Sequence, residues 1–207
     1  MTTADLILQG KADIDAVHAA GYAKGLAVGG DDYYDKFWDV MQAKGERVNY
    51  MYAFAYDRFS DEIYNPKYPI NTKSGTTPSR YMFAQSAGIT DTKVPIYANG
   101  NDINYCFQGC TGLVTIRELN VTASQTYTST FASCTALENI TFSGAIGKDI
   151  SFADSPNLTI DSLTSIINAL ETKTDGGTYT LTLHSAAKAR LTDELKQIVA
   201  DKGWQIQ

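Results

Sequence analysis

The chain contains 207 residues, enough for one or two domains; its 43% of hydrophobic residues is ordinary for a soluble globular protein, and its 19% of charged residues is rather low. Its formal net charge of −6 argues against a nucleic-acid backbone or an anionic membrane as the partner. No apolar stretch is long enough to span a bilayer, and the first residues lack the basic and apolar regions of a signal peptide.

The N-terminal segment, residues 1–30, is expected to serve attachment. Residues 12–28 are rich in alanine and glycine and predict a helix that begins near Asp13. Apolar or small residues recur there at every seventh position, as in a short coiled coil. One interpretation is a segment for oligomerisation or for docking on a larger assembly, and the other is a frayed N-terminal helix. The candidate oligomerisation residues are Ile14, Val17, Gly21, Gly25 and Val28.

Residues 31–80 predict a helical and aromatic N-terminal cap. An amphipathic helix with an aromatic face is expected first and ends near Gly45. From Tyr50 to Tyr56 aromatic residues alternate with others, which predicts a strand with one aromatic face. Such a row either forms a platform for a sugar or a protein, or packs as the cap at the end of a repeat array. The candidate binding residues are Tyr50, Tyr52, Tyr56 and Tyr64.

A short motif recurs through residues 81–160. FQGCTGLVTI, which begins at Phe107, aligns without gaps with FASCTALENI, which begins 24 residues later at Phe131. Weaker copies begin 24 residues before Phe107, at Phe83, and 21 residues after Phe131, at Phe152. A period of 21–24 residues is typical of a leucine-rich-repeat solenoid, in which stacked copies share one core. The predicted repeat-core residues are Phe83, Phe107, Cys110, Leu113, Ile116, Phe131, Cys134, Leu137, Ile140, Phe152 and Leu158.

Residues 161–207 depart from the motif and predict an α/β C-terminal cap. A helix begins near Asp161 or Ser162, a strand follows at residues 178–184, and a last helix ends near Gly203 before a final short strand. The expected fold class is therefore α+β: a short leucine-rich-repeat solenoid with N-terminal helices and an α/β C-terminal cap.

The cysteines and histidines do not indicate a metal site or a cofactor. The odd number of cysteines, Cys106, Cys110 and Cys134, argues against a disulfide framework. Cys110 and Cys134 hold equivalent motif positions, which favours small buried residues. With only His18 and His184 in addition, no cluster of metal ligands is expected.

No sequence motif for catalysis is present, and we expect no enzymatic activity. A cysteine–histidine pair would need His18 or His184, and nothing in the sequence places either beside a cysteine. Asp57, Asp61 and Glu62 could pair as acid and base, as glycosidases require, but they lie in a polar turn where carboxylates are common.

The two central copies resemble the BspA-like leucine-rich repeats, whose pattern is roughly F-x-x-C-x-x-L-x-x-I. The closing segments, 155–172 and 191–206, resemble the ends of repeat proteins encoded by gut-type bacteria and their prophages. The opening, from residue 21 to 70, is similar to the N-terminal region of phage and prophage structural proteins that carry such repeats. BspA-type surface proteins usually carry a secretion signal, so its absence favours the phage interpretation.

The resemblance implies a non-enzymatic, virion-associated structural or adhesion protein, assembled in the bacterial cytoplasm. Its partner would be a protein or a cell-surface glycan, bound by several weak sites on one particle, with no nucleic acid and no membrane insertion. A homo-oligomer or a virion component is expected. Two alternatives are a BspA-like surface adhesin and a cytoplasmic protein-interaction scaffold.

Overall fold

The computed structural model describes residues 50–207, except 52, 57–60, 62, 63, 65, 67, 73, 74, 76, 77 and 101. The chain divides into two compact units, Met1–Gly45 and Glu46–Gln207, and the described residues belong to the second. The predicted oligomerisation residues lie outside the described residues: Ile14, Val17, Gly21, Gly25 and Val28.

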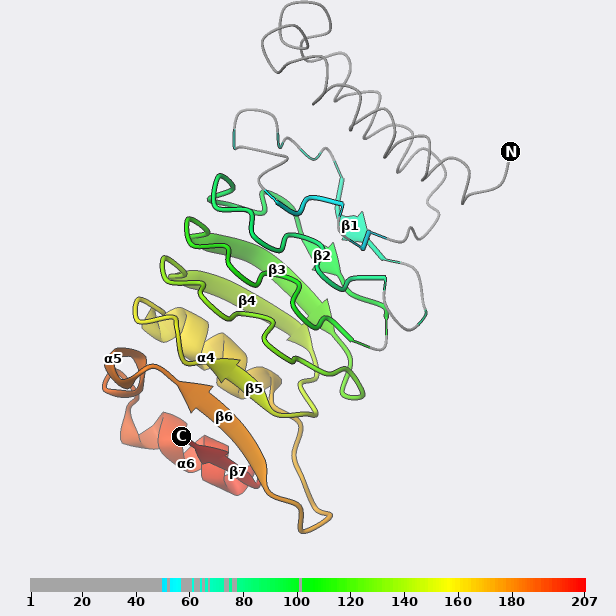
Figure 1. The fold of residues 1–207 in the computed structure, drawn as a ribbon. Coiled ribbons are helices and arrows are strands. Elements are labelled where there is room, and N and C mark those ends of the chain that lie inside the picture. Colours follow the sequence, from blue (N-terminus) through cyan, green and yellow to red (C-terminus); the bar gives the residue numbers. More distant parts are fainter. Residues whose placement is uncertain are drawn as a thin grey trace, which may run out of the picture. The chain divides into compact units, whose positions relative to one another are not determined.

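Two parallel sheets form the described unit (Figure 1). The first sheet has the order β1-β2-β3-β4, and every neighbouring pair in it is parallel. The second has the order β5-β6-β7 and is also parallel throughout. The strands are β1 (Ile70–Asn71), β2 (Ile96–Tyr97), β3 (Thr115–Val121), β4 (Asn139–Gly144), β5 (Ile150–Phe152), β6 (Tyr179–Leu183) and β7 (Trp204–Ile206).

The motif copies stack on one another in space, which places the core. The rings of Phe83 and Phe107 stack with centroids 5.3 Å apart, and those of Phe107 and Phe131 at 5.8 Å. The row continues to Phe54 at one end and to Phe152 at the other, at 4.9 and 4.5 Å. All the predicted repeat-core residues, from Phe83 to Leu158, are buried. The sequence period therefore identifies side chains that share one core.

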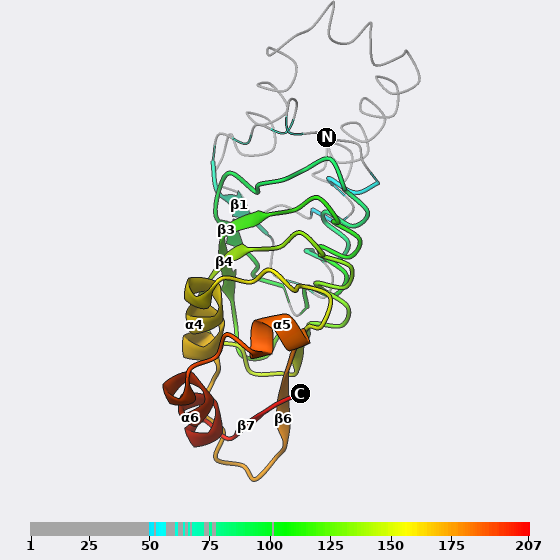
Figure 2. The same ribbon diagram turned by 90° about the vertical axis from the view of Figure 1, so that its left-hand side faces the viewer.

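Helix α4 (Ile160–Ala169) covers the edge of the first sheet. Thr159 caps its N-terminus by accepting a hydrogen bond from the amide of Ser162. The hydroxyls of Ser162 and Ser165 accept hydrogen bonds from the backbone amides of Ile140 and Phe142 in β4, at 2.9 and 2.8 Å. Figure 2 shows α4 directly beyond β4, in line with the first sheet. An exposed strand edge is thereby satisfied by side chains instead of another strand.

Helices α5 (Ser185–Lys188) and α6 (Asp193–Asp201) complete the described unit. Thr192 caps α6, and acidic residues occupy its first turn, where the helix dipole favours them. Just after α6, the Lys202 ammonium donates to the carbonyls of Ile167, Asn168 and Leu170 at the end of α4, at 3.1, 2.7 and 2.7 Å. These bonds satisfy carbonyls that a helix end leaves unpaired, and they join the two helices.

The predicted fold class is wrong. In place of an α+β solenoid with a separate C-terminal cap, the described residues form an α/β fold with two small parallel sheets and the helices α4, α5 and α6. Within residues 161–207, β6 and β7 extend a sheet that begins at β5 in the last motif copy. The physical reason is that the motif spacing shortens before Phe152 and α4 occupies the edge of β4, so β5 pairs with β6.

The predicted aromatic strand near residue 50 is also absent from the described residues. The described part of 50–56 forms turns, and Tyr56 has a φ of 62°, which an extended strand excludes. Of the alternating aromatic residues there, Tyr50 and Phe54 are buried in the core, whereas Tyr56 is exposed.

Candidate binding groove

A hollow of about 690 Å³ lies between the third motif copy and the second sheet. Three segments line it, 126–129, 148–151 and 178–182, together with Gln207. Most of the lining side chains carry a hydroxyl group, so we call the hollow the hydroxyl groove. Its residues are Thr126, Tyr127, Thr128, Ser129, Lys148, Asp149, Ile150, Ser151, Thr178, Tyr179, Thr180, Thr182 and Gln207.

Strand alternation positions the polar side of the groove. In β5, Ile150 and Phe152 are buried and Ser151 is exposed. Register pairs Ser151 with Thr182 of β6, so the two hydroxyl side chains stand beside one another on the same face. The outward face of a parallel sheet thus carries hydroxyls instead of the apolar residues that a covering helix would need.

The groove is open because a ladder of backbone hydrogen bonds stops beside it. The amides of Ile103 and Tyr105 donate to the carbonyls of Thr126 and Thr128, at 3.1 and 2.9 Å. One copy later, the amides of Tyr127 and Ser129 have no acceptor among the described residues. The last motif copy begins 21 residues after the third copy, whereas the other copies are 24 residues apart. Its strand β5 pairs with β6 and is not in register with the segment 127–129.

Gly147 fixes the start of the groove. A Cβ atom on this glycine would lie 2.1 Å from the carbonyl oxygen of Ala123. Only glycine allows the two segments to approach so closely here. Beyond this contact the segments diverge, and the hollow begins at Lys148 and Thr126.

Tyr127 has the most unusual polar atom of the groove. The residue is 4% exposed, and its hydroxyl is the buried side-chain polar atom without a hydrogen-bond partner in the described part of the chain. A tyrosine hydroxyl is protonated at neutral pH, and burial raises the pKa of Tyr127 further above the ordinary value. An unpaired buried hydroxyl is costly, by about 1–3 kcal/mol, and suits a site that a polar ligand completes.

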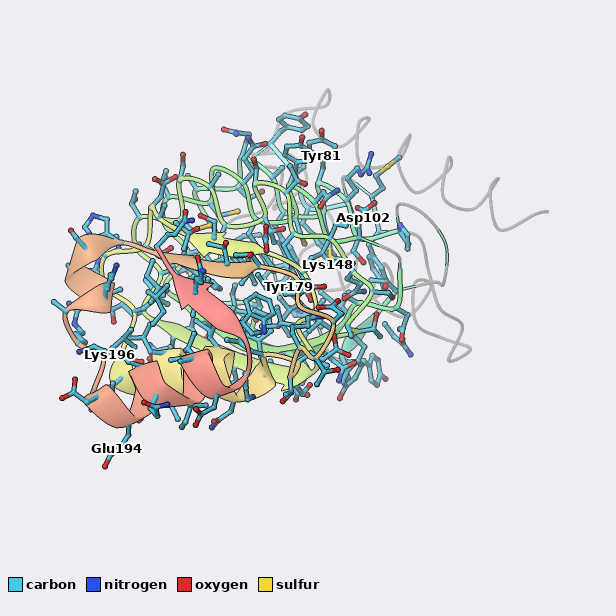
Figure 3. The ribbon with its side chains drawn as sticks, turned by 90° about the horizontal axis from the view of Figure 1, so that it is seen from below. Tyr81, Asp102, Lys148, Tyr179, Glu194 and Lys196 are labelled. Carbon is cyan, nitrogen blue, oxygen red and sulfur yellow. The ribbon has the colours of Figure 1, made fainter. Side chains whose placement is uncertain are left out.

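Tyr179 presents a fixed ring at the other side of the groove. Its hydroxyl donates to Asp175 at 2.7 Å, a bond that raises the pKa of Tyr179 and lowers that of Asp175. The ammonium of Lys173 lies 4.3 Å from the ring centroid. Figure 3 labels Tyr179 close to Lys148, a cation that lines the same hollow.

Asp149 adds a carboxylate to the groove. Its Oδ1 accepts a hydrogen bond from the amide of Thr180 at 2.9 Å, which fixes the side chain against β6. Asp149 and Lys148 are both exposed, so charged groups of opposite sign stand next to the hydroxyls. The groove therefore offers donors and acceptors in close succession, beside a similar amount of apolar surface.

The predicted aromatic platform is not brought together on the surface. Tyr50 and Tyr64 are buried, at 1% and 0% exposure, whereas Tyr56 is 58% exposed and Tyr52 lies outside the described residues. The Tyr64 hydroxyl donates to the carbonyl of Thr92, at 3.0 Å, and its ring packs edge-on against Phe54 and Phe83. Tyr64 and Tyr50 thus belong to the core, and Tyr50 stacks on Phe54 with ring centroids 6.0 Å apart.

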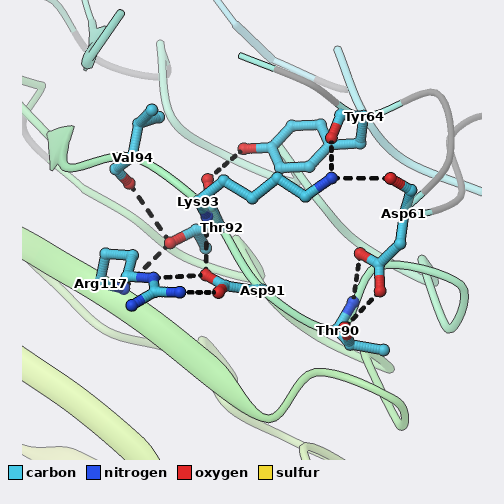
Figure 4. A network of polar contacts seen from close by, with 8 residues as sticks. All are labelled: Asp61, Tyr64, Thr90, Asp91, Thr92, Lys93, Val94 and Arg117. Atoms are coloured by element: carbon cyan, nitrogen blue, oxygen red, sulfur yellow. Dashed lines mark hydrogen bonds and ion pairs between the residues drawn. The ribbon is translucent and has the colours of Figure 1, made fainter. Parts of the chain in front are cut away.

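A polar network joins this N-terminal part to the next loop (Figure 4). Lys93 donates to the carbonyls of Asp61 and Tyr64, at 2.7 and 2.6 Å. Asp61 accepts from the amide of Thr90 at 2.9 Å and also from its hydroxyl. Asp61, one of the carboxylates considered for acid–base chemistry, therefore ties two segments together; Asp57 and Glu62 lie outside the described residues.

The other candidates for chemistry hold structural positions. His184 caps α5 through its Nδ1, which accepts from the amide of Ala186 at 3.1 Å, while His18 is outside the described residues. Cys106, Cys110 and Cys134 are free and buried, and burial raises the pKa of Cys106 and Cys134. In the described residues, no three His, Cys, Asp or Glu side chains gather as metal ligands.

Sequence reasoning missed the groove. Residues 123–131 read as a polar connecting arc, and residues 178–184 as a strand. The one available signal was the density of hydroxyl residues in these two stretches. It did not show that they face one another, because that depends on which strand pairs with β5.

Comparison of the chain with family models, curated proteins and solved structures finds no match. Within the described part of the chain, no helix is both long and apolar enough to cross a membrane.

Proposed function

We propose that this chain is a non-enzymatic binding protein whose hydroxyl groove binds a cell-surface glycan. The observation that carries the proposal is a hydroxyl-rich hollow lined in part by Tyr127, whose buried hydroxyl has no partner among the described residues. A glycan offers many hydroxyls that both donate and accept, and so it complements such a lining.

The character of the lining supports a glycan over an apolar or a strongly charged ligand. Pockets for apolar ligands are lined mainly by hydrophobic side chains. Among the residues that line the hydroxyl groove, Ile150 is the one with an aliphatic side chain, and most of the others carry a hydroxyl group. Lys148 and Asp149 carry opposite charges, so neither a polyanion nor a polycation is favoured. The unpaired amides of Tyr127 and Ser129 add donors along one wall.

Binding should be tested with the full chain on an array of bacterial surface polysaccharides and oligosaccharides. Tyr127→Phe removes the unpaired hydroxyl and is expected to lower affinity about threefold to tenfold, the effect of one lost hydrogen bond. Tyr97→Phe is the matched control, because Tyr97 is half-buried in β2 and does not line the groove. Absence of binding to every glycan, or equal affinity of native chain and Tyr127→Phe, would contradict the proposal.

The same substitution separates binding from folding. Because the hydroxyl has no partner in the free protein, Tyr127→Phe should leave stability unchanged or raise it by about 1 kcal/mol. Lower affinity together with equal or higher stability is the pattern that a binding hydroxyl predicts and that a merely structural tyrosine does not.

We further propose that the protein is part of a phage or prophage particle, where several copies would give avidity. The support is the resemblance of the opening and closing segments to phage structural proteins. Mass spectrometry of purified particles should detect the chain at a fixed ratio to the other virion proteins. Its absence from particles, with recovery from intact cells by surface proteolysis, would favour the surface adhesin. A pull-down yielding one stoichiometric host protein would favour the scaffold.

A further inference from the structure

The ring of Tyr105 has one aromatic neighbour in the described part of the chain. Tyr81 stacks on it with centroids 4.7 Å apart and ring planes 3° from parallel. Both residues have left-handed backbone conformations, with φ of 56° and 59°. They occupy equivalent places 24 residues apart, so the chain builds a short stack of tyrosines beside the phenylalanine row.

Ser129 occupies the next place in this stack. It lies 24 residues after Tyr105 and has the same left-handed backbone, with a φ of 50°. The Tyr81 amide donates to Asn104 and the Tyr105 amide to Thr128, so the three segments follow one another in one direction. Two residues further on, the equivalent phenylalanines stack at 5.3 and 5.8 Å. The second face of Tyr105 is therefore turned toward a position where a serine replaces a ring.

This vacant stacking position adjoins the hydroxyl groove. Ser129 is exposed and lines the groove, whereas Tyr105 is half-buried and lies just outside its lining. A ligand ring placed over Ser129 would stack on the ring of Tyr105. The rest of the same ligand could then occupy the groove beside Tyr127 and Thr128. The face of an aromatic ring carries partial negative charge and attracts the weakly positive C–H groups of a sugar ring.

We infer that Tyr105 and Ser129 form a stacking subsite for a pyranose ring of a gluco-configured oligosaccharide that continues into the hydroxyl groove. This inference rests on the proposed function and specifies its ligand class. A gluco-configured ring has equatorial hydroxyls, so it presents C–H groups on its faces and hydroxyls at its edge. The face suits Tyr105, and the edge suits the hydroxyls of the groove.

The test uses cellohexaose and chitohexaose as probes, with affinities measured by isothermal titration calorimetry on the full chain. Tyr105→Ala removes the ring and should lower affinity about tenfold, while Tyr105→Phe, which keeps the ring, should restore most of it. Ser129→Tyr should extend the stack and fill the subsite, lowering affinity at least about tenfold. The backbone accepts this change, since Tyr81 and Tyr105 adopt the same conformation.

Ser133→Tyr is the control for the added ring. Ser133 is exposed, has a φ of 60°, and lies outside the groove lining, so a tyrosine there should leave binding unchanged. Saturation-transfer NMR gives a second readout, because ring C–H protons stacked on Tyr105 should receive more saturation in the native chain than in Tyr105→Ala.

The outcomes separate this inference from the broader proposal. If Tyr105→Ala and Ser129→Tyr both keep the native affinity while Tyr127→Phe loses affinity, the stacking subsite is overturned and the proposal that the groove binds a glycan stands. Binding of other array glycans but neither probe likewise overturns the inferred ligand class alone. Absence of binding to any glycan overturns both.

Discussion

Cys110 and Cys134 make the same hydrogen bond one motif copy apart. The Cys110 thiol donates to the carbonyl of Phe83 at 3.0 Å, and the Cys134 thiol donates to that of Phe107 at 3.1 Å. In the earlier copy, the hydroxyl of Ser86 donates in the same way to the carbonyl of Phe54. This motif position therefore requires a small side chain that can donate a hydrogen bond to the preceding motif copy. Serine and cysteine both meet this requirement.

The first prediction concerns this donor. Cys134→Ser should destabilise the protein by less than about 1 kcal/mol, because the hydroxyl can keep the bond. Cys134→Ala should cost about 1–2 kcal/mol, since it removes the donor and leaves a small cavity. Urea denaturation measures both. An equal cost for serine and alanine would show that packing of the sulfur, and not its hydrogen bond, decides the choice of residue.

The second prediction concerns the stack of phenylalanines. Phe107 lies in its middle and is fully buried, with Phe83 and Phe131 on its two faces. Phe107→Ala should destabilise by about 3–5 kcal/mol. Phe107→Leu retains most of the volume and should cost markedly less. Thermal and urea unfolding of both variants test this, and a small effect of Phe107→Ala would mean that the stack collapses around the cavity.

The third prediction separates close backbone approach from backbone strain. Gly144 has a φ of 85°, and a Cβ there would lie 2.0 Å from the carbonyl oxygen of Val121. Gly176 has a similar φ of 74° but nothing within 4 Å of its Cβ position. Gly176→Ala should cost about 1 kcal/mol, from the left-handed conformation alone. Gly144→Ala should cost at least about 3 kcal/mol, because strand β4 must also move away from β3. Similar losses in the two variants, measured by urea denaturation, would contradict the role assigned to the close approach.

The fourth prediction concerns alkaline pH. Burial raises the pKa of Tyr64 and Tyr127 above the ordinary value of about 10. Above that pH the unfolded chain loses these protons while the folded chain keeps them, so stability falls as pH rises. Each tyrosine contributes a slope of up to about 1.4 kcal/mol per pH unit. The raised pKa values of Cys106 and Cys134 begin the decline about one pH unit earlier.

Unfolding free energies measured between pH 8 and pH 11 check the fourth prediction. Tyr127→Phe should reduce the slope above about pH 10 by up to about 1.4 kcal/mol per pH unit. An unchanged slope in this variant would show that Tyr127 ionises in the folded protein, and hence that its hydroxyl is open to solvent.

The fifth prediction concerns the N-terminal segment, which lies outside the described residues. If residues 12–28 associate, Gly21 and Gly25 allow close helix contact, and replacing both with leucine should lower the solution mass measured by light scattering. Lys11→Ala, before this segment, serves as the control. A native chain that is already a monomer would contradict self-association through these residues.

The sequence period was sufficient to identify the core. Phe107 and Phe131, with Cys110 and Cys134, were found from their 24-residue spacing alone, and all four are buried where the copies stack. Such a period can be recognised in the sequence because each motif copy forms the same short-range turn. In all four copies the residue three after the phenylalanine donates its amide to the phenylalanine carbonyl: Ser86, Cys110, Cys134 and Ser155.

The groove and the fold class were decided only by tertiary structure. The sequence showed that the spacing shortens before Phe152, but it did not show that β5 would pair with β6 while α4 covers β4. Strand pairing depends on contacts between residues far apart in the chain, which a local pattern does not encode. Tyr127, whose hydroxyl has no partner among the described residues, and Ser129 line a hollow whose other walls include β5 and β6, so the groove depends on that pairing.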